Sequence, residues 1–296
     1  MTNQPSRAAL RAMLVLLATA SAALAQVPKP ATVPDDSIFG FTSPTGLGRA
    51  GDTGIALETT TRSGKGSGRF VSSTAKLEFG RTLTDDLWVA GSVFGLAHRI
   101  ARVDGVDADR RVTAFEGLSG EVAVRVLRRT DSFPVAVTLS IEPGWSRHDG
   151  TTGARAEGFA SEQKLFVDMP LIADRLFIAA NASWLAGVQR SSEPGSLWQR
   201  GSAATLSAAI SLSLGNVFVG AEIRSLSAFN GTFLNQQIGR ALYAGPNVLW
   251  KVNETVSANL AVTPQLTGHA RGRPDRTLDL DNFERSQVRA KVAFSF

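Results

Sequence analysis

Charged side chains recur at alternate positions within otherwise apolar segments of this sequence. Successive side chains of a β-strand point to opposite faces, so each such segment would have one charged and one apolar face. Charges of both signs on neighbouring strands could pair across a wet interior, or they could line a polar path that selects solutes by charge. Both interpretations stay open for the predicted inner set of Glu58, Lys76, Glu78, Glu121, Arg125, Glu142, Glu162, Lys164, Asp168, Glu222, Arg224, Lys251, Arg289 and Lys291.

The three histidines, His98, His148 and His269, all lie near strand ends that lead into the longer loops. A histidine beside a serine at such a rim would suit a lipid-hydrolysing or lipid-modifying enzyme. Strand parity predicts that His148 and His269 point inward from opposite sides, so they cannot share a site. His98 stays a candidate without an assigned serine. Because no nucleophile, base and orienting group can be named together, we predict no enzymatic activity and no catalytic residue.

No motif for a metal or a cofactor appears. The segment 64–68 (G-K-G-S-G) has Gly66 where a phosphate-binding P-loop needs Ser or Thr after the lysine, and no helical pattern follows it. Two groups of loop arginines and lysines are either solvated or bind lipopolysaccharide phosphates. They are Arg62, Lys65 and Arg69, and Arg271, Arg273 and Arg276.

The last eleven residues show most clearly which element positions the charges. Val288, Ala290, Val292, Phe294 and Phe296 alternate with Gln287, Arg289, Lys291, Ala293 and Ser295. A strand with so apolar an outer face needs lipid against that face and neighbouring strands for its backbone. A closed transmembrane barrel meets both needs.

About twelve such segments follow one another, which predicts an all-β, antiparallel up-and-down barrel with both termini on the periplasmic side. Short turns are expected near residues 84, 130, 173, 215 and 253, and longer loops near 66, 107, 150, 193, 233 and 275. The predicted strands lie near residues 52–62, 69–81, 87–100, 115–127, 135–145, 154–169, 176–188, 198–214, 217–227, 238–252, 255–268 and 286–296.

The tryptophans sort by strand end, as two interfacial aromatic girdles would require. Trp88 and Trp250 flank short turns, whereas Trp145 and Trp198 lie toward the longer loops.

The N-terminal part of the chain predicts export. Arg7 and Arg11 precede the apolar run 12–24 and the small-residue site 23–25, so residues 1–25 are expected to be a cleaved signal peptide. Residues 26–50, rich in Pro, Gly, Ser and Thr, form a lead-in that either plugs the barrel mouth or extends on the periplasmic side. Residues 51–296 form the barrel. The sequence has no cysteine, which excludes a disulfide framework.

The C-terminal Phe296, with Phe294 and the alternating residues before it, resembles the C-terminal signature of bacterial outer-membrane proteins. That resemblance implies recognition by the barrel-assembly machinery. Two further segments, 39–42 (F-G-F-T) and 278–285 (L-D-L-D-N-F-E-R), are similar to those of an uncharacterised family of proteobacterial outer-membrane barrels. The resemblance covers most of the mature chain and implies no activity, cofactor or site residue.

The leading prediction is therefore a passive channel for small polar solutes in the outer membrane, either narrow or gated. The alternatives are a lipid-modifying or lipid-binding enzyme and a structural or surface-binding barrel. Outer-membrane lipid and lipopolysaccharide are the expected surroundings, and nothing in the sequence suggests nucleic-acid binding.

Overall fold

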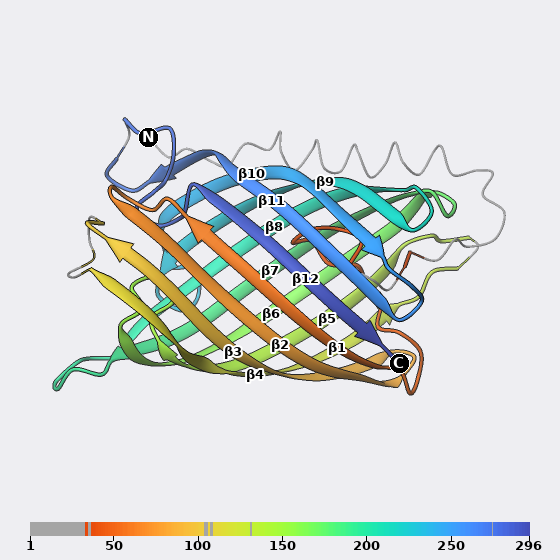
Figure 1. Ribbon diagram of the computed structural model, residues 1–296, viewed down its shortest axis with the longest axis horizontal. Coiled ribbons are helices and arrows are strands. Elements are labelled where there is room, and N and C mark those ends of the chain that lie inside the picture. Colours follow the sequence, from red (N-terminus) through yellow and green to blue (C-terminus); the bar gives the residue numbers. More distant parts are fainter. Residues whose placement is uncertain (1–32, 35–36, 104–105, 107–108, 131, 274) are drawn as a thin grey trace.

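A closed antiparallel barrel of twelve strands forms the molecule (Figure 1). The computed structural model describes residues 33–34, 37–103, 106, 109–130, 132–273 and 275–296. Within that part of the chain, no helix is long and apolar enough to cross a bilayer. The predicted signal peptide, residues 1–25, lies outside the described residues. The strands are β1 (Thr53–Ser63), β2 (Arg69–Thr84), β3 (Leu87–Ala101), β4 (Arg110–Leu127), β5 (Ala136–His148), β6 (Arg155–Ile172), β7 (Leu176–Ser191), β8 (Gln199–Ser213), β9 (Val217–Asn230), β10 (Gln236–Lys251), β11 (Val256–Ala270) and β12 (Ser286–Ser295).

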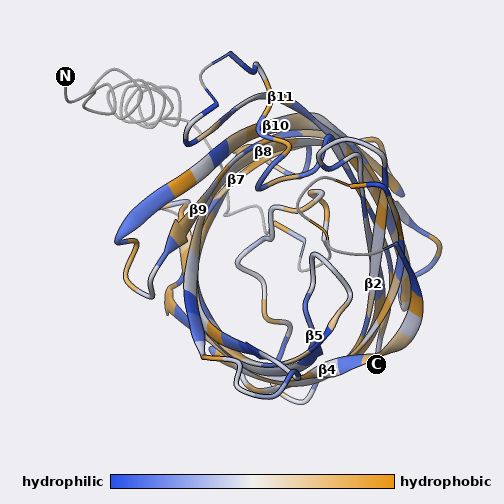
Figure 2. Ribbon diagram, turned by 90° about the vertical axis from the view of Figure 1, so that its left-hand side faces the viewer, coloured by the Kyte–Doolittle hydropathy of each residue, from blue (hydrophilic) through white to orange (hydrophobic). Residues whose placement is uncertain are grey.

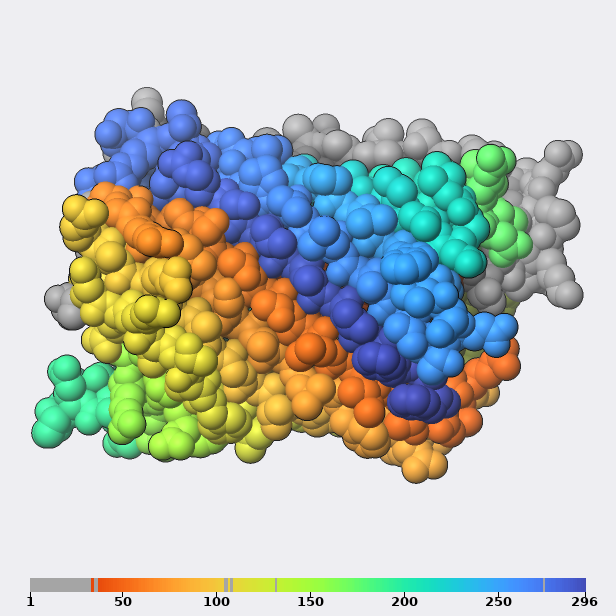
Figure 3. All heavy atoms as spheres, viewed as in Figure 1, coloured from red at the N-terminus to blue at the C-terminus, as the bar shows by residue number. Residues whose placement is uncertain are grey.

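The barrel closes where β12 pairs with β1. Their register runs from Gly54 opposite Ser295 to Ser63 opposite Ser286, without a shift. At the end of the seam, Phe296 and Thr53 exchange two backbone hydrogen bonds of 2.8 and 3.0 Å. The space-filling view shows β12 as a continuous band between β1 and β11 (Figure 3). The expected closing strand is confirmed, and the sheet has no free edge.

The connections alternate between the two ends of the barrel. The short-turn end holds 85–86, 173–175, 214–216 and 252–255, and also the longer connection 128–135, because β5 begins only at Ala136. The other end, here called the long-loop end, holds 64–68, 102–109, 149–154, 192–198, 231–235 and 271–285. The first residue of β1 and the C-terminus both lie at the short-turn end (Figure 1).

The two faces of the wall differ as the alternation predicts. Large apolar side chains such as Leu57, Phe79 and Leu206 are half or more exposed on the outer face. The alternate positions are buried or polar and face the interior, where additional chain segments lie inside the ring (Figure 2). An apolar belt outside and a polar interior is the pattern of membrane barrels.

Residues 37–50, here called the inner segment, run inside the barrel before β1. Their Ile38 and Phe39 are fully buried and pack against Phe177 of β7, Phe218 of β9 and Leu249 of β10. These wall residues are apolar on the inner face, which alternation alone would assign to polar residues. A local apolar cluster near the short-turn end therefore holds the inner segment against the wall.

Several strand pairs contain register shifts, and those in β11 and β4 change the expected direction of a side chain. In β11, Gln265 pairs with Tyr243 but Thr267 pairs with Leu242, so one extra residue intervenes and the later positions change face. His269 is consequently exposed and does not point inward as expected. In β4, Glu116 is the extra residue between Phe115 and Gly117.

Trp88 also differs from the expected girdle. It pairs with Thr82, whose hydroxyl donates to the Leu47 carbonyl of the inner segment, so both side chains are on the inner face. A Cβ on Gly80 would lie 2.5 Å from the Trp88 ring, which shows how closely the ring covers that glycine. Trp198 and Trp250 are 42% and 53% exposed, and Trp145 shares the outer parity of Ile141.

We predict that cysteines at Thr59 and Ala290, which face each other across the β1–β12 seam, will cross-link. Directly opposed Cβ atoms lie about 5 Å apart, within reach of a short thiol-reactive linker. The readout is loss of the unfolded-mobility band on a non-reducing gel. The matched control joins Ala290→Cys to Ala182→Cys of β7, which is several strands away. Equal cross-linking of both pairs would contradict this closure.

We also predict that Gly117→Val will impair folding, because a Cβ there would lie 1.9 Å from the Trp145 carbonyl oxygen of β5. That overlap involves backbone and cannot be relieved by a rotamer change. Gly120→Val is the control on the same strand, since its Cβ would meet only the Ala90 carbonyl oxygen, at 3.8 Å. The measurement is the fraction of heat-modifiable, folded protein after refolding. A G117V barrel that folds as well as G120V would disprove the predicted clash.

Candidate functional site

The interior contains a cavity of about 600 Å³ in the middle of the barrel. Charged, hydroxyl and amide side chains from β1, β2 and β4 to β9, with Arg289 of β12, form much of its lining, and Phe41 and Ser43 of the inner segment border it. Among the predicted inner residues, Glu58, Lys76, Glu142, Glu162, Lys164, Arg224 and Arg289 line this cavity.

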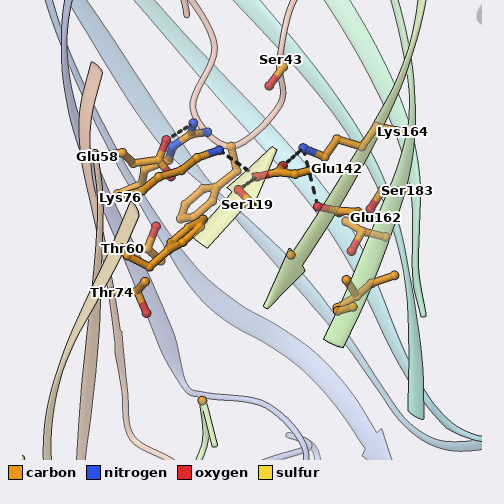
Figure 4. A pocket seen from close by; sticks show the side chains of 18 of the residues that line it. Ser43, Glu58, Thr60, Thr74, Lys76, Ser119, Glu142, Glu162, Lys164 and Ser183 are labelled. Carbon is orange, nitrogen blue, oxygen red and sulfur yellow. Dashed lines mark hydrogen bonds and ion pairs between the residues drawn. The ribbon is translucent and has the colours of Figure 1, made fainter. Parts of the chain in front are cut away.

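Two lysines converge on one carboxylate at the cavity wall. Lys76 of β2 lies 3.1 Å from Glu142 of β5, and Lys164 of β6 lies 2.5 Å from the other oxygen of the same group. Figure 4 shows the two lysines approaching Glu142 from opposite sides. Since all three side chains are less than one-fifth exposed, their charges are largely compensated within the cluster.

Further carboxylates complete this cluster. Lys76 also pairs with Glu78 at 2.7 Å, and Lys164 lies 3.3 Å from Glu121 and 3.7 Å from Glu162. The Ser119 hydroxyl donates to Glu142 at 2.7 Å. Acidic groups outnumber the two lysines, so this part of the wall carries excess negative charge.

A second pair bridges the closing seam. Arg289 of β12 donates to Glu58 of β1 at 2.5 Å and to the Gly40 carbonyl at 2.8 Å. Lys291 reaches the Ser37 hydroxyl at 3.1 Å. The same basic residues therefore connect the seam to the inner segment.

Glu222 of β9 binds the inner segment through its backbone. The Glu222 carboxylate accepts hydrogen bonds from the amides of Phe41 at 2.8 Å and Thr42 at 3.0 Å, and from the Thr42 hydroxyl at 3.2 Å. Glu222 is 4% exposed, so these donors supply much of the stabilisation that water would otherwise give its charge.

Asp168 of β6 binds the next turn of the segment. It accepts from the Thr45 amide at 2.7 Å and the Thr45 hydroxyl at 3.0 Å, and it pairs with Arg129. The Thr138 hydroxyl donates to the Thr45 carbonyl at 2.8 Å. Asp168 is 1% exposed, and removing its partners would leave a buried charge, which costs several kcal/mol.

The Phe41 ring packs between two arginines. The Arg224 guanidinium carbon lies 3.6 Å from the ring centre, and that of Arg289 lies 5.8 Å away. Arg224 is held in place by the Gln287 amide oxygen at 2.6 Å and the Thr263 hydroxyl at 3.0 Å. A cation over an aromatic face stabilises the contact further where water is excluded.

The loop 271–285 enters the barrel from the long-loop end. Phe283 packs on Ala241 and Tyr243 of β10, and Asp279 is fully buried, with its amide donating to Gln265 at 2.8 Å. Lys65, in the loop between β1 and β2, donates to the Asn282 carbonyl at 2.7 Å. Burial lowers the pKa of Lys65, and Glu284 at 4.0 Å opposes part of that shift.

The remaining predicted inner residues lie apart from the cavity. Arg125 is half-buried near the short-turn end, where its amide donates to the Asp86 carbonyl at 2.9 Å. Lys251 lies 5.5 Å from the Phe218 ring centre at the same end. Arg62, which was expected in a loop, belongs to β1 and lines the cavity. Sequence reasoning missed Glu116, which also lines the cavity, and Thr45. The β4 bulge places Glu116 inward, and regular alternation gives no signal for it.

The structure pairs His98 with a serine that the sequence left unassigned. His98 of β3 is directly opposite Ser72 of β2, and its Nε2 lies 2.5 Å from the Ser72 hydroxyl oxygen. Both residues face the interior, and they are 3% and 1% exposed. A nucleophile so enclosed cannot reach a lipid outside the wall, so this pair is best explained as an internal hydrogen bond. Within the described residues, no group of acidic, cysteine or histidine side chains could hold a metal ion.

Solved outer-membrane barrels share this fold. An outer membrane channel from Pseudomonas putida F1 superposes with a TM-score of 0.59 at 8% identity, covering 90% of this chain and 100% of the channel. The beta domain of the Bordetella autotransporter BrkA gives 0.56 at 12% identity, covering 83% and 100%. The NanC porin gives 0.50 at 9% identity, covering 81% and 98%. At these identities the likeness concerns the fold alone.

No curated protein matches the chain by sequence. A family model matches residues 31–296 of the chain, which confirms the expected resemblance to an uncharacterised family. This protein belongs to DUF6662, a family of unknown function.

Proposed function

We propose that this protein is an outer-membrane channel for small polar solutes, gated by its inner segment. The observation that carries the proposal is the cavity of about 600 Å³, lined by charges of both signs inside a barrel whose outer face is apolar. A barrel that served only as a scaffold would gain more stability by filling this space with apolar side chains than by burying ion pairs.

The cavity suits small polar solutes, with carboxylates concentrated in the wall cluster and Arg62, Arg224 and Arg289 elsewhere on the lining. At the wall cluster, Glu121, Glu142 and Glu162 surround Lys164, so a cation meets more carboxylate than ammonium groups there. Rings of acidic side chains are a common basis of cation selectivity in pores. Along the same path, a solute that has lost water could form hydrogen bonds with hydroxyl and amide side chains, namely those of Thr60, Thr74, Asn181, Ser183 and Thr205.

The inner segment supplies the gate in this proposal. Its contacts with the wall are hydrogen bonds to Glu222 and Asp168, the Phe41 stack and the packing of Ile38 and Phe39. None of these contacts is covalent, and the segment continues into β1 without a helix or a strand. Its release would join the cavity to the short-turn end, since Phe41 and Ser43 border the cavity on that side.

The orientation follows from the same reasoning. Outer-membrane barrels place short turns toward the periplasm, so the proposal puts the inner segment and both termini there. The exposed Phe296, 69% accessible, would be available to the assembly machinery before insertion. Gating would then respond to periplasmic conditions.

We predict that Glu222→Gln combined with Asp168→Asn will raise channel conductance or open probability. An amide NH2 facing the Phe41 and Thr42 amides places donors against donors, and the second change removes the ion pair with Arg129. The measurement is single-channel conductance of the full chain in planar bilayers. Asp86→Asn is the matched control, because it also removes a carboxylate that pairs with an arginine, Arg128, but Asp86 lies in the turn 85–86 and contacts neither the cavity nor the inner segment. Complete absence of conductance in wild type and double variant would overturn the channel proposal.

We predict opposite changes in ion selectivity from two substitutions in the wall cluster. Lys164→Gln leaves its neighbouring carboxylates without an ammonium partner and should shift the reversal potential toward greater cation preference. Glu142→Gln should shift it the other way. Both are measured in a salt gradient across the bilayer. Reversal potentials that do not change in either variant would exclude this cluster from the permeation path.

A further inference from the structure

The outer wall opens between β4 and β5 near the long-loop end. These strands pair from Leu127 opposite Val137 as far as Gly117 opposite Ser146, and β4 then continues to Arg110 paired only with β3. The Glu116 bulge at this point bends β4 away, as an extra residue in one strand does. The separation leaves a recess of about 360 Å³.

The recess has an apolar lower part and a basic upper part. Phe115 and Trp145 lie on the outer face with ring centres 6.4 Å apart. Arg147 and Arg155, both exposed, line the same recess beyond these rings. Glu157 also lines it, and its carboxylate pairs with Arg190 at 2.6 Å. Phe159 and Trp198 form a second aromatic pair nearby, at 6.1 Å, with Arg190 lying 4.7 Å from the Trp198 ring centre.

A second pair of arginines extends the basic part along β3 and β4. Arg99 and Arg111 are directly opposite each other, exposed, and on the outer parity of Phe115. Like charges in directly opposed positions destabilise a strand pair, so an anion between them would be stabilising. Among the described residues, none of the side chains of Arg99, Arg111, Arg147 and Arg155 has an ion pair or hydrogen bond.

The distance between the aromatic rings and the arginines along the barrel axis matches the boundary between lipid acyl chains and headgroups. Strands rise about 3.3 Å per residue and tilt roughly 40° in membrane barrels, so Arg111 lies about 10 Å beyond Phe115 along the barrel axis. Arg147 lies about 5 Å beyond Trp145 by the same reckoning. Aromatic rings at the interface and arginines just above them match a lipid whose headgroup carries phosphate.

We propose that this recess, lined by Phe115, Trp145, Arg147 and Arg155 and flanked by Arg99 and Arg111, binds a phosphorylated glycolipid of the outer leaflet. The guanidinium groups bind the headgroup phosphates in a bidentate manner, and the aromatic pair contacts the acyl chains. The site lies in the wall between β4 and β5 beside the central cavity, with which it shares Trp145 and Ser146 as lining residues. It depends on the outer-membrane location and not on conduction.

The test compares binding of bisphosphorylated and dephosphorylated lipid A to the purified full chain in detergent, measured by native mass spectrometry. We expect wild type to prefer the phosphorylated lipid by about tenfold or more, since two charge-assisted hydrogen bonds account for such a ratio. The Arg147→Gln/Arg155→Gln and Arg99→Gln/Arg111→Gln double variants should each lose most of that preference. The control, Arg200→Gln/Arg240→Gln, removes exposed arginines of β8 and β10 and should keep it.

A second readout separates binding from folding. Without lipid, the Arg111→Gln variant should unfold at a higher temperature than wild type, because the substitution removes a like charge opposite Arg99. With bisphosphorylated lipid A bound, the variant should unfold at a lower temperature than wild type, because it binds the lipid less tightly. If Arg111 had only a structural role, the lipid would not reverse the sign of the change in unfolding temperature. The proposal is overturned if the control loses the preference equally, if the recess variants keep it, or if inorganic phosphate at equal concentration binds as tightly as the lipid.

Discussion

A β-strand in a hydrocarbon layer can place its backbone N–H and C=O groups only on a neighbouring strand, because no water is available there. In this molecule the requirement is met when β12 returns to β1 over the register from Gly54 to Ser63. Once the sheet is closed, every residue has a definite inner or outer face. The polarity of the interior, the position of the inner segment and the outer apolar belt all follow from that closure.

Many of the charged groups in the polar interior share partners across the wall. Carboxylates on adjacent or nearby strands share the ammonium groups of Lys76 and Lys164, while Glu222 and Asp168 accept backbone amides of the inner segment. A buried charge is tolerated only with such partners, so the wall and the segment inside it stabilise each other. The segment is held mainly by individual hydrogen bonds and one apolar cluster, and the proposed gating would break these contacts without breaking the pairing between strands.

Irregular positions in the strands account for the features that set this barrel apart from a regular cylinder. The extra residue at Glu116 brings a carboxylate into the cavity and bends β4 away from β5. Gly117 allows close backbone approach to β5 immediately before the two strands separate. The same bulge thus affects both the central cavity and the recess on the outer wall.

The sequence by itself determined the fold class, the number of strands and most strand boundaries within a few residues, because alternation of polar and apolar side chains is a local property. It also identified most of the inner charges, such as Glu142 and Lys164. Local alternation could not find the bulges that turned His269 outward and Glu116 inward, since one inserted residue reverses all later faces. Only the tertiary structure decided that Trp88 faces inward, that Ser72 meets His98, and that residues 37–50 bind Glu222 and Asp168. Those contacts join residues far apart in the chain, and their pairing depends on how the barrel closes.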